Sequence, residues 1–264
     1  MGMLTQAKRV VIKVGTSTLT HDTGRLNLRR VSKLARVLAD LKNAGREVIL
    51  VTSGAVGVGV GRLNLPGRPD DVAGRQAAAA VGQCELMDVY DKAFAEFGCL
   101  TGQMLLTRDA MDAGVRERNI LNTLDRLLVL GVLPIINEND TVSTDELEGT
   151  MFGDNDTLSA LVARLCGAGA LVLLTDTDGL YDGDPRRDPR AKHIPVVHAI
   201  DGRILALAGS AGSARGTGGM ATKVAAAKIA VEAGISTVIM SGEEPEKLYE
   251  LFEGKACGTL FEAK

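Results

Sequence analysis

Short apolar runs rich in β-branched residues alternate along this chain with longer segments of helical periodicity. The runs lie at residues 9–15, 47–54, 100–107, 132–140, 170–181 and 236–240. Near-continuous apolar strands that alternate with helices are typical of a parallel sheet whose two faces are both covered. The pattern therefore predicts an α/β fold, with a mainly parallel central sheet sandwiched between helices.

The segments between these runs carry helical patterns, at 28–45, 74–98, 116–131 and 157–169. The clearest is 28–45, where apolar residues recur every three or four positions and Gly45 follows as a candidate C-terminal cap. Its predicted buried face consists of Leu28, Val31, Leu34, Ala35, Leu38 and Leu41. Residues 54–61 and 178–190 are predicted to be surface loops. The chain shows no long linker and no internal repeat, so residues 1–264 are expected to form a single domain.

Composition excludes several classes of function. The 264 residues carry a net charge of −3, which argues against a general nucleic-acid or membrane-surface binder. The four cysteines are too widely spaced for a metal knuckle, and free thiols in a reducing cytoplasm are expected. No apolar run is long enough to span a bilayer, and no cleavable apolar leader is visible.

Polar residues gather where the predicted strands end. They lie at 13–15, 52–54, 137–140 and 175–176. Open parallel sheets bind ligands beyond the carboxyl ends of their strands. The sequence therefore predicts an active site at that edge of the sheet.

Two lysines are candidates for binding an anion there. Lys13 interrupts an apolar strand and precedes the segment GTSTL, whose backbone N–H groups suit a phosphate. Lys223 follows a glycine-rich loop in GTGGMATKVAAAKIA, residues 216–230, at the start of a predicted helix. The Walker pattern is absent, and GVGVGR has Arg62 where a dinucleotide fingerprint needs its last glycine.

Two clusters of carboxylates and amides, INEND at 136–140 and FGDND at 152–156, indicate a polar substrate that carries an ammonium group. Taken alone, Asn155 or Asp156 also suits a helix N-cap, and Ser53 suits an N-cap and a substrate ligand equally well. An oxygen-rich site without histidine suits Mg²⁺ rather than zinc.

Seven motifs in order resemble the glutamate 5-kinases, a branch of the amino acid kinase family. They are IKVGTSTL, VTSGAVGVG, QAAAAVGQCELM, PIINENDTVS, FGDNDTLSALVA, LLTDTDGLYDGDPR and GTGGMATKVAAAKIA. The resemblance covers nearly the whole chain and implies the amino acid kinase fold. Many members carry an additional C-terminal PUA domain, and this chain resembles the short form that consists of the kinase alone.

The resemblance implies a role for each matching position. Lys13, Lys223 and Asp156 are expected to be catalytic, with Asp156 organising the two lysines. Ser53, Asp140 and Asn155 are expected to bind the amino-acid substrate. The ATP-binding positions are expected to be Lys13, Gly15, Thr175, Asp176, Thr217, Gly218, Gly219, Met220, Ala221, Thr222 and Lys223. Asp154 belongs to the same motif without an assigned role.

The implied activity is ATP-dependent phosphorylation of the γ-carboxylate of L-glutamate, the first step of proline biosynthesis, with ATP as co-substrate and Mg²⁺ as cofactor. The resemblance also implies a homo-oligomer and feedback inhibition by proline. Alternatives are an acetylglutamate kinase, an aspartokinase, a uridylate kinase, or a non-catalytic amino-acid sensor on the same fold. The retention of both lysines argues against a sensor.

Overall fold

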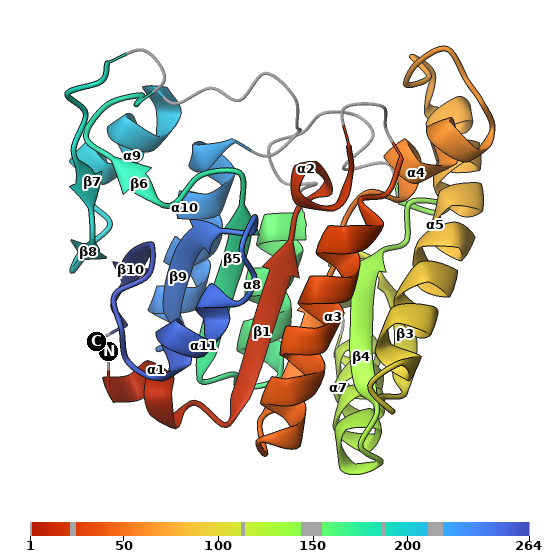
Figure 1. Ribbon diagram of the computed structural model, residues 1–264, viewed down its shortest axis with the longest axis horizontal. Coiled ribbons are helices and arrows are strands. Elements are labelled where there is room, and N and C mark those ends of the chain that lie inside the picture. The colour runs from red at the N-terminus through yellow and green to blue at the C-terminus, as the bar shows by residue number, and fades with distance from the viewer. Residues whose placement is uncertain are drawn as a thin grey trace.

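The computed structural model describes residues 2–21, 25–111, 114–143, 155–185, 188–210 and 219–263. Most of its strands form one sheet of eight, in the order β3-β4-β2-β1-β5-β9-β10-β8 (Figure 1). The strands are β1 (Arg9–Val14), β2 (Glu47–Val51), β3 (Thr101–Leu106), β4 (Leu133–Glu138), β5 (Ala170–Thr175), β8 (Val196–Val197), β9 (Ser236–Ser241) and β10 (Thr259–Phe261). A separate two-stranded ribbon pairs β6 (Leu180–Tyr181) with β7 (His193–Ile194).

The sheet is mainly parallel, as the sequence predicts. Strands β3, β4, β2, β1, β5 and β9 pair in parallel, and β10 runs antiparallel to β9. The short strands β8 and β10 at that end are not among the predicted elements. Because β10 is only three residues long and β8 only two, neither leaves a clear periodic signal in the sequence.

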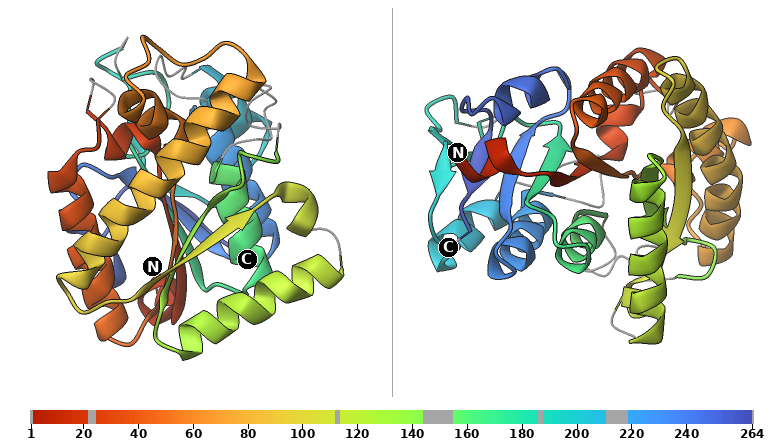
Figure 2. Two further views of the ribbon diagram at one scale, coloured as in Figure 1. Left: turned by 90° about the vertical axis from the view of Figure 1, so that its right-hand side faces the viewer. Right: turned by 90° about the horizontal axis from the view of Figure 1, so that it is seen from below.

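Helices cover both faces of this sheet (Figure 2). The helices are α1 (Gly2–Gln6), α2 (Thr16–Leu19), α3 (Leu28–Asn43), α4 (Ala55–Arg62), α5 (Val72–Ala95), α6 (Arg108–Met111), α7 (Val115–Val129), α8 (Asn155–Leu165), α9 (Gly202–Ser210), α10 (Met220–Glu232) and α11 (Lys247–Phe252). One hydrophobic core joins α3, α5 and α11 to the sheet, and a second joins α7, α8 and α10 to its opposite face.

Successive side chains of β1 alternate between the two hydrophobic cores. Val10, Ile12 and Val14 belong to the core under α3, whereas Val11 belongs to the core under α8 and α10. Successive side chains of a strand point to opposite faces, so Lys13 shares its face with Val11. The strand register alone therefore directs Lys13 toward α8 and α10.

Two sequence predictions differ from the structure here. Residues 54–61, predicted to be a loop, form most of α4, which packs tightly on α5. A Cβ atom at Gly59 or Gly82 would overlap a backbone carbonyl oxygen of the other helix, so the glycines serve close helix packing rather than a turn. Leu28 is 63% exposed at the start of α3, whereas the other five residues of its predicted face are buried. Gly45 has the positive φ angle of 99° expected after a helix.

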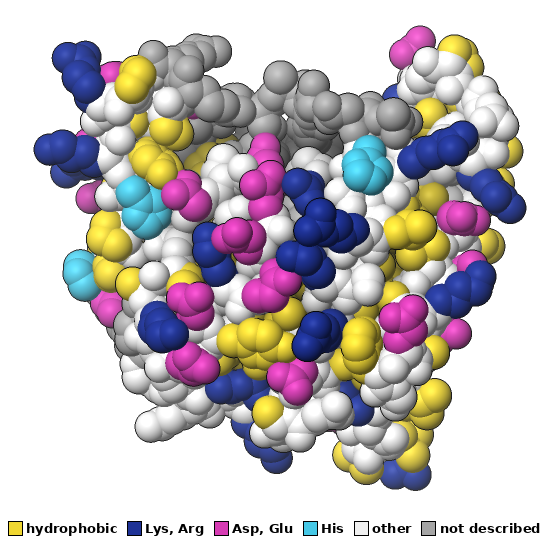
Figure 3. Space-filling model, in the orientation of Figure 1, with side chains coloured by type: hydrophobic (Ala, Val, Ile, Leu, Met, Phe, Trp, Pro, Cys, Tyr) yellow, Lys and Arg dark blue, Asp and Glu magenta, His cyan; other side chains and the backbone are white. Residues whose placement is uncertain are grey.

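The surface in the orientation of Figure 1 carries Lys and Arg interspersed with Asp and Glu (Figure 3). This mixture agrees with the small net charge of −3. No helix in the described part of the chain is long and apolar enough to cross a membrane.

Candidate active site

The site lies beyond the carboxyl ends of the parallel strands, at the upper edge of the sheet in Figure 1. Helix α2 follows β1 there, and three residues separate the end of β2 from the start of α4. Helix α8 begins with Asn155 and Asp156, and Gly219 precedes α10. Helix N-termini carry partial positive charge and free N–H groups, so their gathering at this edge favours an anionic ligand.

A buried carboxylate joins the two candidate lysines. Lys13 Nζ of β1 lies 2.5 Å from Asp156 Oδ1, and Lys223 Nζ of α10 lies 3.1 Å from Asp156 Oδ2. The side chains of Lys13, Lys223 and Asp156 are 5%, 8% and 0% exposed. The Thr222 hydroxyl donates a further hydrogen bond of 2.9 Å to Asp156 Oδ2. Segments far apart in the sequence therefore meet on one carboxylate.

The electrostatics of this cluster follow from burial and charge. Burial by itself raises the pKa of Asp156, but the two neighbouring ammonium groups outweigh it and hold that pKa well below its ordinary value. Asp156 is therefore ionised at neutral pH. Within the described residues, two ammonium groups share this one carboxylate, so the charges of the three side chains sum to +1 and favour an anionic ligand.

A row of polar side chains continues from α8 across the ends of β2 and β4. Asn155 Nδ2 donates to Ser53 Oγ at 3.2 Å and to Asn137 Oδ1 at 2.9 Å. Asn137 Nδ2 donates in turn to Gln83 Oε1 of α5 at 2.8 Å. All four residues are buried. Asp140, two residues beyond β4, is buried at the same edge of the sheet.

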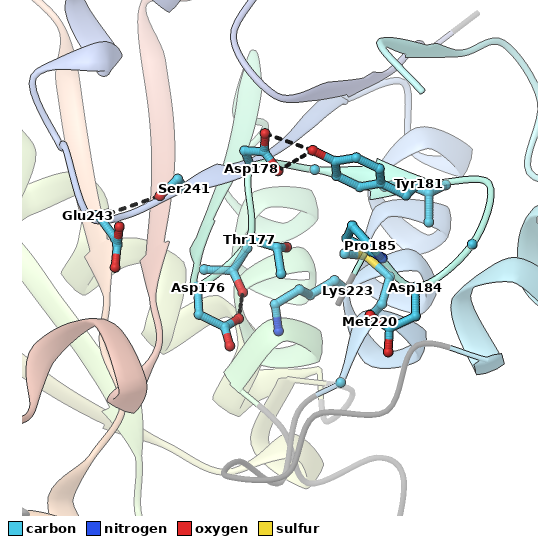
Figure 4. Close-up of a pocket in the computed structure, with 15 residues that line it drawn as sticks. Asp176, Thr177, Asp178, Tyr181, Asp184, Pro185, Met220, Lys223, Ser241 and Glu243 are labelled. Atoms are coloured by element: carbon cyan, nitrogen blue, oxygen red, sulfur yellow. Dashed lines mark hydrogen bonds between the residues drawn. The ribbon is translucent and has the colours of Figure 1, made fainter. Parts of the chain in front are cut away.

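A cavity of about 480 Å³ opens beside Lys223. Its lining comes from the end of β5, the segment that follows it, the start of α10 and the end of β9. Figure 4 shows Lys223 among these residues, with Asp176 and Thr177 on one side and Met220 on the other. The Thr175 hydroxyl donates to Asp176 Oδ1 at 3.0 Å, which fixes the two side chains at the strand end.

The structure brings most of the predicted site residues to this edge. Thr175, Asp176, Gly219, Met220 and Lys223 line the cavity. Ala221 and Thr222 belong to the first turn of α10 and do not line the cavity. Asp154, Thr217 and Gly218 lie outside the described residues.

Gly15 lies between β1 and α2. A Cβ atom there would lie 3.7 Å from Lys13 Nζ, so the glycine leaves the space beside this ammonium open. A larger residue would narrow the approach of a ligand to Lys13.

Sequence reasoning missed other residues of this edge. Ser241 and Glu243 line the cavity at the end of β9, and the strand-end rule applied to residues 236–240 would have found them. Residues 178–190, predicted to be a surface loop, contain β6 and contribute Asp178 and Asp184 to the cavity lining. Nothing in the sequence marks Gln83 as a site residue, because its contact with Asn137 depends on how α5 packs in the folded protein.

The comparisons with known proteins agree with this geometry. The sequence profile of the amino acid kinase family matches residues 8–241. Two solved structures share the fold: a UMP kinase from Bacillus anthracis, with a TM-score of 0.66 at 16% identity over 98% of this chain and 97% of its own, and an isopentenyl phosphate kinase, with a TM-score of 0.63 at 15% identity over 96% and 99%. The chain belongs to the amino acid kinase family.

Curated relatives narrow the assignment within that family. A glutamate 5-kinase from Symbiobacterium thermophilum is 52% identical over 98% of this chain and 97% of its own length. A glutamate 5-kinase from Clostridium perfringens is 49% identical over 99% of this chain and 97% of its own length. At this identity and coverage, the chain is placed with the glutamate 5-kinases.

Proposed function

We propose that this protein transfers the γ-phosphoryl group of ATP to the γ-carboxylate of L-glutamate, giving ADP and γ-glutamyl phosphate. The observation that carries the proposal is the pair of buried lysines on Asp156, which lies beside a cavity of about 480 Å³ at the carboxyl edge of the sheet. The relatives named glutamate 5-kinase, which are 49% and 52% identical to this chain, support glutamate as the phosphoryl acceptor.

The proposed chemistry needs charge stabilisation rather than proton transfer. A glutamate side-chain carboxylate has an ordinary pKa of about 4.3, so it is already an ionised nucleophile at neutral pH. Its oxygen forms a bond to the γ-phosphorus while the bond from that phosphorus to the β,γ-bridging oxygen breaks, and ADP leaves with the electron pair. An anion must therefore approach a polyanion, which makes positioning and positive charge decisive.

The chain supplies that positive charge in preorganised form. Lys13 comes from strand β1 and Lys223 from helix α10, and Asp156 of α8 contacts both ammonium groups. Preorganised charges cost little reorganisation as charge shifts in the transition state. Glycines at 15 and 219 leave room for the backbone to approach the phosphates closely.

We assign the two substrates to different halves of the site. We assign the nucleotide to the cavity lined by Thr175, Asp176, Gly219, Met220 and Lys223. The assignment extends to Gly15 and to 217–218 and 221–222, the remaining predicted ATP positions.

We assign glutamate to the polar row that begins at Ser53 and Asn155, together with Asp140. Lys13 and Asp156 lie between the two halves, because Asp156 directly follows Asn155 and also contacts Lys223 of the nucleotide cavity.

Mg²⁺ fits this site as a companion of the nucleotide. The described residues contain no group of three or more His, Cys, Asp or Glu side chains poised to hold a metal ion. Mg²⁺ commonly keeps several waters and binds through substrate phosphates. When bound, it would neutralise part of the phosphate charge. The carboxylates that line the cavity beside such an ion belong to Asp176, Asp178, Asp184 and Glu243.

Several further expectations remain part of the proposal. They remain predictions: a homo-oligomer, inhibition by proline, a cytoplasmic location and a single domain over residues 1–264. The continuous eight-stranded sheet supports the single domain. The free cysteines Cys84, Cys99, Cys166 and Cys257 support a reducing compartment.

An ATP-dependent hydroxamate assay tests the proposed function. Hydroxylamine traps an acyl phosphate as a stable hydroxamate, so the assay reports formation of the product directly. L-glutamate, N-acetylglutamate and L-aspartate are compared at equal concentrations. Hydroxamate from L-glutamate in clear excess supports the proposal. Preference for N-acetylglutamate or aspartate would assign a different acceptor, and no hydroxamate from any of them would indicate a non-catalytic sensor.

A further inference from the structure

The polar row behind Ser53 has a fixed hydrogen-bond direction. The backbone N–H of Glu138 donates to Asn137 Oδ1 at 2.9 Å, and a backbone N–H has no alternative role. This contact identifies the oxygen of the Asn137 amide, which is otherwise hard to tell from its nitrogen. The neighbouring amides must then follow: Asn155 presents its nitrogen to Asn137 Oδ1, and Gln83 presents its oxygen to Asn137 Nδ2.

Within the described residues, this direction leaves one unpaired atom on each of the two outer amides, Asn155 and Gln83. Asn155 Oδ1 is a buried acceptor and Gln83 Nε2 a buried donor, and neither has a hydrogen-bond partner among the described residues. Asn155 is 2% exposed and Gln83 is 8% exposed. A buried polar atom without a partner is costly, so such an atom at a ligand site points to a group supplied by the ligand.

The atom on the substrate side is the oxygen of Asn155. Its amide nitrogen is already committed to Ser53 and Asn137, so only the oxygen is left to meet a ligand. An oxygen acceptor matches a donor, and an α-ammonium group is the donor that an amino-acid substrate carries. Reversing the Asn155 amide would present a nitrogen to that cation and repel it.

Helix α5 holds the far end of the row in place. Gly82, next to Gln83, packs so closely on α4 that a Cβ atom would overlap the carbonyl oxygen of Ala55. Two turns later the Tyr90 hydroxyl lies 2.9 Å from Thr52 Oγ1, at the end of β2. Gln83 therefore projects from a helix that is fixed against the site on both sides.

We propose that Gln83 is a positioning residue for substrate selection. Through Asn137 it fixes the Asn155 amide with its oxygen toward the substrate, and this orientation makes the site selective for an acceptor that carries an α-ammonium group. The inference rests on the proposed function, because it takes Asn155 as a ligand of the amino acid. Gln83 acts through its oxygen, and its nitrogen takes no part.

Two substitutions of similar size distinguish a role of the Gln83 side-chain oxygen from a role of Gln83 in packing alone. Gln83→Glu keeps an oxygen acceptor for Asn137, whereas Gln83→Met removes it. Each variant is assayed with L-glutamate and with glutarate, which has the same carboxylates but lacks the α-ammonium group. Thermal unfolding checks each fold, and Gln83→Ala replaces Gln83→Met if the latter does not fold.

We expect Gln83→Met to raise KM for L-glutamate by about ten- to a hundredfold, the worth of one hydrogen bond to a charged group. KM for ATP and kcat/KM for glutarate should stay at wild-type values, so the preference for glutamate over glutarate falls. Gln83→Glu should retain that preference.

Other results would overturn the inference. An unchanged preference in Gln83→Met, or an equal loss with both substrates, would reduce Gln83 to a packing residue. Loss of preference in Gln83→Glu would assign the role to the nitrogen instead. Wild-type protein that fails to phosphorylate glutamate would reject the proposed function itself, which is a separate and recognisable outcome.

Discussion

Replacing Asp156 by asparagine tests whether one carboxylate supports both lysines. The substitution keeps the size of the side chain but removes its charge, and it leaves two buried ammonium groups without their shared counter-ion. At the observed separations of 2.5 and 3.1 Å, each attraction is worth about 5–7 kcal/mol at an effective dielectric constant of about 20. Desolvation of the three charges offsets much of this sum.

The net effect on stability is set by the charges left behind. Removing one partner of a buried ion pair typically costs about 3–5 kcal/mol, because the remaining charge stays buried and uncompensated. We therefore expect Asp156→Asn to lower the free energy of unfolding at pH 7 by about 3–5 kcal/mol. Turnover should fall as well, since neither lysine is then held toward the phosphates.

The depressed pKa of Asp156 also predicts how the stability difference between wild type and Asp156→Asn changes with pH. The pKa of Asp156 is depressed in the folded protein, so its contribution to stability is complete above the unfolded pKa of about 3.9 and is lost as the pH falls toward the folded value. The difference in unfolding free energy between wild type and Asp156→Asn should therefore narrow on acidification, by about 1 kcal/mol at pH 3.

Urea denaturation at pH 7 and pH 3 measures both quantities. Asp88→Asn is the matched control, because Asp88 forms an exposed ion pair with Lys92 on α5. That control should change stability by less than about 0.5 kcal/mol. A variant Asp156→Asn as stable as wild type at pH 7, or a gap that widens toward pH 3, would refute the reasoning.

Four further predictions follow from the same structure. Lys223→Ala should lower kcat by at least about a hundredfold, while urea denaturation shows less loss of stability than Asp156→Asn; near wild-type turnover would remove Lys223 from the reaction. Asp140→Ala should raise KM for glutamate in steady-state kinetics, and a change confined to KM for ATP would reverse our division of the site. Gly82→Ala should lower the unfolding free energy by at least about 2 kcal/mol, because its Cβ would overlap the backbone of α4, and a neutral result would contradict that packing. Burial raises the pKa of the Cys166 thiol to about 11, so a disulfide reagent at pH 8 should modify the exposed Cys84 first, and rapid reaction at Cys166 would contradict its burial.

The sequence predicts the sheet and the edge that carries the site, because both depend on local patterns. Continuous apolar runs and β-branched composition reveal β1, β2, β4 and β5, and the polar residues after them mark the carboxyl ends. Lys13 is conspicuous because it interrupts such a strand. Its partner Asp156 has no comparable signal, since an acidic residue in the first turn of a helix has an ordinary structural explanation.

What sequence reasoning misses depends on contacts between distant segments. The glycine-rich sequence of α4 looks like a loop. Gly59 is needed there because α5 approaches closely, and only the tertiary structure shows that contact. Gln83 looks like any polar residue of a long helix until Asn137 is placed against it. Strands β8 and β10 are too short for periodicity to reveal and are held by their neighbours in the sheet.

An isotope label tests most directly whether a carboxylate oxygen of glutamate attacks the γ-phosphorus of ATP. L-glutamate with ¹⁸O in its γ-carboxylate is incubated with ATP and the protein, and hydroxylamine cleaves the product at its acyl carbon. The released phosphate is then analysed by ³¹P NMR. We expect one ¹⁸O atom in each phosphate formed in this way. Phosphate that carries no label, released at the same rate with and without glutamate, would contradict it.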